Sequence, residues 1–190
     1  MNSKKDSGEE RIVAELVNDR LIVWNIEQSR ALYKLGYYGK PIGVPKPKNF
    51  EFDAALTLDL IEGFHLLRNG MITVVKGNKK MGPAALERLA KRYHEGFEIK
   101  YKVYEDLRKK GFVVTPGIKF GCTFATYEHG PGIDHAPFLV EVKEQSDSVT
   151  APDLVRAGRL ATTVKKRFVF AIVNKRTGSI DYLVSKWWKA

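Results

Sequence analysis

Three side chains in the C-terminal half of the sequence could together perform acid–base chemistry. Tyr127 ends an apolar segment, His135 follows eight positions later in a glycine-containing loop, and Lys166 precedes an apolar run that begins at Phe168. A phenol, an imidazole and an ammonium group can form an acid–base set that needs no metal ion. Taken singly, each residue also has a simpler interpretation: a tyrosine packed at a strand end, a loop histidine paired with Asp134, and a solvated lysine.

The surrounding pattern predicts the elements that must position these side chains. Apolar runs bounded by turns or charge predict strands at residues 112–115, 118–127, 138–142 and 168–173, with a turn at Pro116-Gly117 between the first two. Apolar residues at helical spacing predict a helix over residues 153–164 with Asp153 as its N-cap. Three strands, a helix and a final strand indicate an α/β layer.

The N-terminal half reads as a mixture of strands and helices. Asn18-Asp19 predicts a hairpin turn, and Gly36 and Asn69-Gly70 are placed to end helices. We expect strands at 11–17, 20–24 and 71–76, and helices at 26–35, 58–68, 83–94 and 97–109. Three prolines in residues 37–57 predict an exposed basic loop. The sequence therefore predicts an α/β protein with an N-terminal mixed (α+β) domain, residues 1–95, and a C-terminal domain, residues 96–190.

Composition limits the partners and the compartment. The 190 residues carry a formal net charge of +10, which favours a polyanionic partner. Cys122 is the single cysteine, so an internal disulfide is excluded and a packing role is expected. No apolar run approaches the roughly 18 residues that span a bilayer. We expect a cytoplasmic protein with no membrane partner.

Cofactor and metal motifs give a second set of expectations. None of the four histidines pairs with another His or Cys at a zinc-site interval, and no glycine-rich nucleotide loop occurs, so we expect no cofactor and no bound metal. One alternative remains open. Glu141 and Lys143 share a strand face, and with Asp134 they resemble the metal-binding element of restriction-type nucleases, which would make the chain a metal-dependent nuclease.

The combined pattern around Tyr127 has a family resemblance. Tyr127, the glycine-rich loop to His135, and a helix leading into Val164-Lys165-Lys166-Arg167 resemble the archaeal tRNA-splicing (tRNA-intron) endonucleases. The resemblance implies a restriction-endonuclease-like C-terminal domain that cuts precursor tRNA at bulge-helix-bulge splice sites. In that reaction Tyr127 would take the proton from a ribose 2′-hydroxyl, His135 would protonate the leaving 5′-oxygen, and Lys166 would stabilise the charged phosphorane, without a metal.

The same resemblance suggests how RNA and partner subunits are bound. Arg159, seven residues before Lys166, matches a family arginine that stacks on an unpaired base, and Lys186 or Trp187 is a weaker match for a second contact. Lys40, Lys46 and Lys48 could add contacts from the proline-rich segment. That basic insert is similar to a loop of crenarchaeal-type catalytic subunits, and the turn at 174–181 lacks the acidic residues of self-associating members. A two-plus-two heterotetramer with a structural subunit is expected; a noncatalytic RNA-binding subunit is the remaining alternative.

Overall fold

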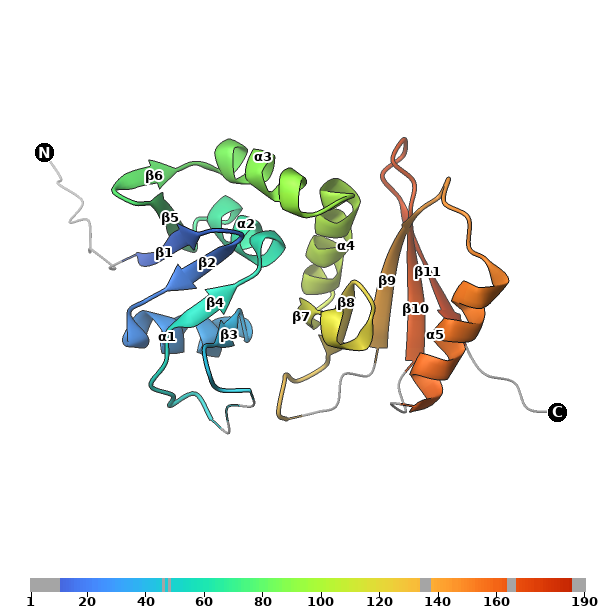
Figure 1. Ribbon diagram of the computed structural model, residues 1–190, viewed down its shortest axis with the longest axis horizontal. Helices are drawn as coiled ribbons and strands as arrows, with labels where there is room; N and C mark the ends of the chain where they lie inside the picture. Colours follow the sequence, from blue (N-terminus) through green and yellow to red (C-terminus); the bar gives the residue numbers. More distant parts are fainter. Residues whose placement is uncertain (1–10, 46, 48, 134–137, 164–166, 186–190) are drawn as a thin grey trace, which may run out of the picture.

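The protein is built on two β-sheets with helix α4 between them (Figure 1). The computed structural model describes residues 11–45, 47, 49–133, 138–163 and 167–185. The first half contains β1 (Ile12–Val17), β2 (Arg20–Val23), α1 (Ile26–Gly36), β3 (Lys40–Pro41), β4 (Leu56–Leu58), α2 (Leu60–Arg68), β5 (Ile72–Lys76) and β6 (Lys79–Met81). The second half contains α3 (Pro83–Tyr93), α4 (Phe97–Lys109), β7 (Val113–Pro116), the 3-10 helix η1 (Ile118–Phe120), β8 (Phe124–Tyr127), β9 (Phe138–Glu144), α5 (Ala151–Thr163), β10 (Arg167–Val173) and β11 (Ile180–Ser185).

The first sheet has the strand order β3-β4-β2-β1-β5-β6. The expected hairpin is confirmed, since β1 and β2 pair antiparallel around a turn in which Asn18 takes a left-handed φ of 55°. Asn25 caps α1 by accepting a hydrogen bond from the Gln28 amide at 2.9 Å. The helix ends as predicted at Gly36, but Tyr37, not the glycine, has the left-handed conformation, with φ 56°.

The proline-rich segment is more ordered than the sequence suggested. We expected residues 37–57 to be one exposed loop, but β3 and β4 pair antiparallel inside it and Phe52 is buried. Pro41 can occupy β3 because that strand is at the sheet edge, where a missing N–H costs no ladder bond. Lys40 therefore lies in an edge strand, and its side chain is exposed.

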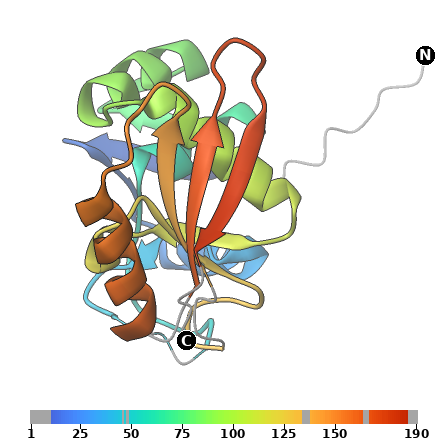
Figure 2. The same cartoon turned by 90° about the vertical axis from the view of Figure 1, so that its right-hand side faces the viewer.

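The second sheet has the order β11-β10-β9-β8-β7 and is covered on both faces. Figure 2 shows α5 beside β9 and β10, with α4 behind them. Side chains alternate along β9, so that Val140 and Val142 join the main core with α4, whereas Leu139 joins a smaller core under α5. The main core is continuous from Leu21 in the first sheet to Val169 in the second.

The predicted strand over residues 118–127 was wrong in its first half. Residues 118–120 form η1, and only Phe124–Tyr127 is a strand. Gly117 makes this compact loop possible, because a Cβ there would lie 2.6 Å from the Cys122 sulfur and 2.7 Å from its carbonyl oxygen. Gly121 follows with φ +67°. Cys122 is buried as expected, but in this loop and not in a strand, and burial raises the pKa of its thiol to about 12.

The predicted N-cap of α5 was also wrong by three residues. The Thr150 hydroxyl accepts from the Asp153 amide at 3.4 Å, and the Asp153 carboxylate accepts from the Thr150 amide at 3.0 Å. This reciprocal pair is a capping box, in which Thr150 is the cap and Asp153 lies in the first turn. The helix therefore starts earlier than predicted, at Ala151. Strands β6 and β11 were not predicted, because charged and exposed residues break their apolar patterns.

One buried arginine connects the two halves. Arg108 of α4 donates to the Gly36 carbonyl at 2.9 Å and to the Tyr104 hydroxyl at 3.1 Å, and its guanidinium lies 4.2 Å from the centre of the Tyr38 ring. The Glu62 carboxylate of α2 is 3.7 Å away, and both side chains of this pair are buried. Burial raises the pKa of Glu62 to about 7, despite the opposing effect of Arg108.

Candidate active site

Tyr127 lies at the end of β8, opposite Val113 of β7. It is half-buried, and it packs with Ala125 against the smaller core, on the face of the sheet that α5 covers. The alternation of β8 gives this orientation, because Phe124 on the other face joins the main core. The predicted base is thus on the α5 side of the sheet.

His135 and Lys166 lie outside the described residues, but the strands that flank them have a defined register. Phe138, the first residue of β9, pairs with Thr126 on one side and with Arg167 on the other. The Arg167 guanidinium is 5.8 Å from the centre of the Phe138 ring. The chain therefore leaves β8, enters β9 and enters β10 at one end of the sheet, next to Tyr127.

The loop that follows Tyr127 is packed against the first half of the protein. Gly130 has φ +135°, and a Cβ on it would lie 2.6 Å from the Tyr37 ring. Gly132, with φ +93°, lies near the Pro47 carbonyl, 3.5 Å from where its Cβ would be. The amide of Ile133 donates to the Gly130 carbonyl at 3.2 Å and closes a turn. The proline-rich segment and α1 thus support the start of the loop that carries His135.

An aromatic cluster supports Tyr37. Its ring is 5.3 Å from that of Tyr33 and 5.5 Å from that of Phe50, and Phe52 lies edge-on to Tyr33 at 5.4 Å. Burial, with smaller contributions from Tyr37 and Tyr127, raises the pKa of Tyr33 to about 12. Tyr33 therefore stays neutral near Tyr127. No local sequence pattern predicted this cluster, although the closely spaced Gly130 and Gly132 were a signal of tight packing in the loop.

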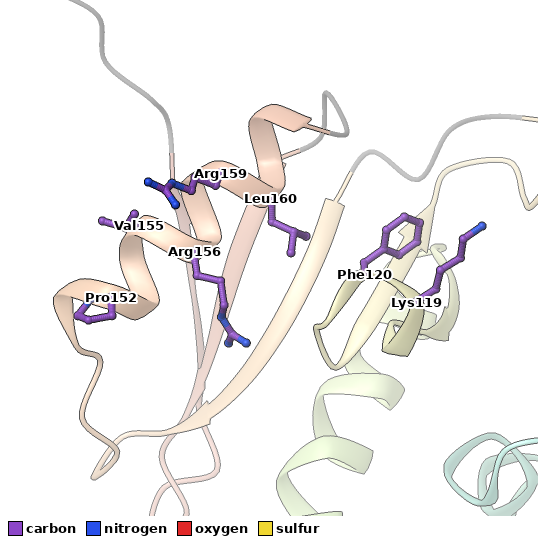
Figure 3. A pocket seen from close by; sticks show the side chains of 7 residues that line it. All are labelled: Lys119, Phe120, Pro152, Val155, Arg156, Arg159 and Leu160. Atoms are coloured by element: carbon purple, nitrogen blue, oxygen red, sulfur yellow. The ribbon is translucent and has the colours of Figure 1, made fainter.

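The predicted RNA-binding residues are not all in the described part of the chain. Arg159 is exposed on α5, and Lys40 is exposed on β3. Lys46, Lys48, Lys186 and Trp187 lie outside the described residues. Arg159 is one of seven residues around a hollow of about 620 Å³ between α5 and η1 (Figure 3). The others are Lys119, Phe120, Pro152, Val155, Arg156 and Leu160.

The alternative nuclease site has one residue with a clear structural role. The Glu141 carboxylate accepts from the Thr123 amide at 2.9 Å and from the Thr123 hydroxyl at 3.0 Å, so it fixes the loop that precedes β8. Lys143 is on the same face of β9, and Asp134 lies outside the described residues. Across the residues that the structure describes, no cluster of three or more His, Cys, Asp or Glu side chains could hold a metal ion.

Comparisons with known proteins agree with this arrangement. The family model for the "tRNA intron endonuclease, N-terminal domain" matches residues 12–87, and that for the "tRNA intron endonuclease, catalytic C-terminal domain" matches residues 97–182. Proteins named tRNA-splicing endonuclease from Hyperthermus butylicus and Sulfurisphaera tokodaii are 45% and 41% identical, each over 94% of this chain and 99% of its own length. One from Saccharolobus solfataricus is 41% identical over the same shares.

The two-sheet α/β fold and the matched catalytic domain define an RNA endonuclease. The chain belongs to the tRNA intron endonuclease family, and it contains both the N-terminal and the catalytic domain of that family. The expected family and fold class are confirmed. In the described residues, no helix is both long and apolar enough to span a membrane.

Proposed function

We propose that this enzyme cuts precursor tRNA at bulge-helix-bulge splice sites, in the cytoplasm, by attack of a ribose 2′-hydroxyl on the adjacent phosphorus. The observation that supports this most directly is the register around Phe138, because β8, β9 and β10 begin or end beside Tyr127 at one end of the sheet. The two segments predicted to carry the acid and the cation leave from that end. The names of the relatives support the substrate class.

In the proposed reaction, three side chains account for both proton transfers and for the stabilisation of charge, so no metal ion is needed. The Tyr127 phenolate takes the 2′-hydroxyl proton while the 2′-oxygen forms a bond to phosphorus. The bond from phosphorus to the 5′-oxygen breaks, and the imidazolium of His135 gives that oxygen its proton. Lys166 stabilises the additional negative charge on the phosphorane oxygens. The products are a 2′,3′-cyclic phosphate and a 5′-hydroxyl.

Basic groups are needed to form the phenolate near neutral pH, since the ordinary pKa of a tyrosine is about 10. Arg167 lies at this end of the sheet, but its side chain packs on Phe138 on the face opposite Tyr127, so it is not placed to supply that charge. We propose that Lys166, its neighbour in sequence, supplies the positive charge. A positive charge beside the phenol favours its deprotonated form.

The test is cleavage of a bulge-helix-bulge RNA in excess EDTA, with analysis of the product ends. Wild-type enzyme with its partner subunit should cut to a cyclic phosphate, and His135→Ala and Tyr127→Phe should each slow cutting at least about 100-fold. His129→Ala is the matched control, because it removes an imidazole from the same loop and should retain activity. If EDTA abolished cutting, the site with Asp134, Glu141 and Lys143 would replace this proposal; binding without cutting would indicate a noncatalytic subunit.

We also propose a two-plus-two heterotetramer with a structural subunit. The turn between β10 and β11 presents Lys175 and Arg176, and its Asn174 side chain accepts from the amides of Arg176 and Thr177 at 2.9 and 3.0 Å. Lys175 pairs with Glu144, and Asp181 is the one acidic residue of the segment 174–181, so this turn lacks the acidic residues of self-associating members. Native mass measurement of the chain alone should not give a tetramer; a stable homotetramer would contradict this assembly.

A further inference from the structure

We propose that the hollow between η1 and α5 is a binding site for the RNA strand beside the cleavage site. In this inference, which rests on the proposed function, Lys119 and Arg156 bind a backbone phosphate and the Phe120 ring contacts an unpaired base. Neither the family resemblance nor the sequence pattern assigned these three residues a role. Arg159, the predicted base-stacking residue, lines the outer rim of the same hollow.

The α5 side of the hollow is one stripe of the helix. Pro152, Val155, Arg156, Arg159 and Leu160 follow the i, i+3, i+4, i+7, i+8 spacing that places side chains on a single face. Figure 3 shows Arg156 and Leu160 pointing toward the sheet, with Arg159 and Val155 on the outer side. Leu160 packs against the smaller core, whereas Val155 is 44% exposed. This face of α5 thus combines apolar and cationic side chains.

The opposite side is formed by η1, which the tight loop around Gly117 holds against the sheet. The Gly117 amide donates to the Thr123 carbonyl at 3.0 Å, and the Cys122 amide donates back to the Gly117 carbonyl at 3.3 Å. This loop leaves Lys119 exposed and Phe120 half-buried. A flat apolar ring beside an exposed ammonium suits a nucleotide, because bases stack on aromatic rings and phosphates bind cations.

The positive charge of the hollow is available to a ligand. Within the described part of the chain, Lys119, Arg156 and Arg159 have no carboxylate within salt-bridge distance. The two nearby carboxylates are engaged elsewhere: Glu141 accepts from Thr123, and Asp153 accepts from Thr150. A polyanion therefore need not displace an existing ion pair.

The location of the hollow favours the RNA substrate over other anions. Phe120, Leu160 and Tyr127 all pack against the same small core, so the hollow and the proposed base share one face of the sheet. Its volume of about 620 Å³ is within the range of pockets that bind small organic ligands, about 300–1,000 Å³. A strand bound at Tyr127 could extend along this face, where the hollow would hold a flanking nucleotide.

The test measures binding separately from cutting. A bulge-helix-bulge RNA with 2′-deoxy sugars at the cleavage sites lacks the nucleophile, so its affinity can be measured at several salt concentrations. Lys119→Ala with Arg156→Ala should weaken binding about tenfold or more and reduce the salt slope by about 0.7 to 1.4. Phe120→Leu should weaken binding about fivefold or more with little change in slope, because it removes stacking and no charge.

Lys79→Ala with Lys80→Ala is the matched control. It removes the same charge from β6, which is far from α5 in the molecule (Figure 1). Equal losses of RNA affinity in the two double variants would contradict the proposed binding site. Unchanged RNA binding together with weaker association of the structural subunit would contradict it as well. The latter result would mean that the hollow binds an acidic protein segment. Wild-type enzyme that bound but did not cut would refute the proposed reaction and leave the binding site standing.

Discussion

The ring of Tyr37 occupies the space that a Cβ on Gly130 would need, with 2.6 Å between the ring and the ideal Cβ position. Tyr37 belongs to the end of α1 and Gly130 to the loop after Tyr127, so the contact joins the first half of the chain to the candidate active site. Because Tyr37 itself has a left-handed φ of 56° and packs among Tyr33 and Phe50, it cannot move easily. We infer that Tyr37 is a positioning residue for this loop.

Gly130→Ala should therefore reduce cleavage at least about tenfold, since a displaced loop misplaces groups that need near-contact geometry. The added methyl group meets the Tyr37 ring, and φ +135° is strained for alanine. Gly132→Ala is the matched control, because φ is +93° there but, among the described residues, the nearest atom is the Pro47 carbonyl oxygen, 3.5 Å from the added Cβ. Single-turnover rates of the two variants give the comparison. A loss as large in Gly132→Ala would assign the effect to backbone strain and not to Tyr37.

Glu62 should give folding stability a specific pH dependence. The pKa of Glu62 is about 7 in the folded protein and 4.5 ordinarily. The protonated side chain therefore makes its full contribution to the free energy of unfolding below about pH 4.5, and this contribution is lost as pH rises to 7. Relative to Glu62→Gln, wild type should lose on the order of 3 kcal/mol between pH 4.5 and 7.5. Urea unfolding of both proteins across this range measures the difference. A constant difference would show that Arg108 keeps Glu62 ionised.

Gly63→Ala tests the packing of α2 on the first sheet. A Cβ at Gly63 would lie 2.2 Å from Cδ1 of Leu21, which is fully buried. Overpacking of this kind typically costs about 1–3 kcal/mol. Gly82→Ala, where no atom of the described residues lies within 4 Å of the added methyl group, should cost about 0.5 kcal/mol through the weaker N-cap of α3. Thermal unfolding of both variants provides the measurement, and equal costs would contradict the packing argument.

Glu141→Gln separates a structural role from a catalytic one. The amide oxygen of glutamine can still accept from the Thr123 amide and hydroxyl, so the loop before β8 should stay in place with a loss of about 1 kcal/mol. We expect the cleavage rate to remain within about threefold of wild type, because the proposed reaction does not use this carboxylate. A folded variant without activity would instead support the site formed by Asp134, Glu141 and Lys143.

Cys122 should be unreactive in the folded protein. The pKa of its thiol is raised to about 12 by burial, so very little thiolate exists near neutral pH. Iodoacetamide at pH 8 should modify the protein in 6 M urea but leave it almost unmodified without denaturant, as followed by intact mass. Rapid native alkylation would mean that the loop around Gly117 opens readily.

Long elements with clear periodicity were predictable from the sequence. The hairpin around Asn18, helices α3 and α4, and strands β9 and β10 are found where their patterns indicated, because burial of one face dictates the residue spacing. The family was also recognisable, since Tyr127 and the glycine-rich loop after it keep their order and spacing. The catalytic assignments of Tyr127, His135 and Lys166 remain predictions.

Features that depend on distant contacts could only come from the tertiary structure. Residues 118–120 have a strand-like composition, yet close packing of Gly117 on Cys122 and the Glu141 bond to Thr123 turn them into η1. Strand β4 forms because it pairs with the edge of β2, and no local sequence pattern indicates this pairing. The contact of Tyr37 with Gly130 joins residues 93 positions apart. The sequence by itself determined the family and the main elements through local spacing, whereas the supports of the site depend on pairs that only folding brings together.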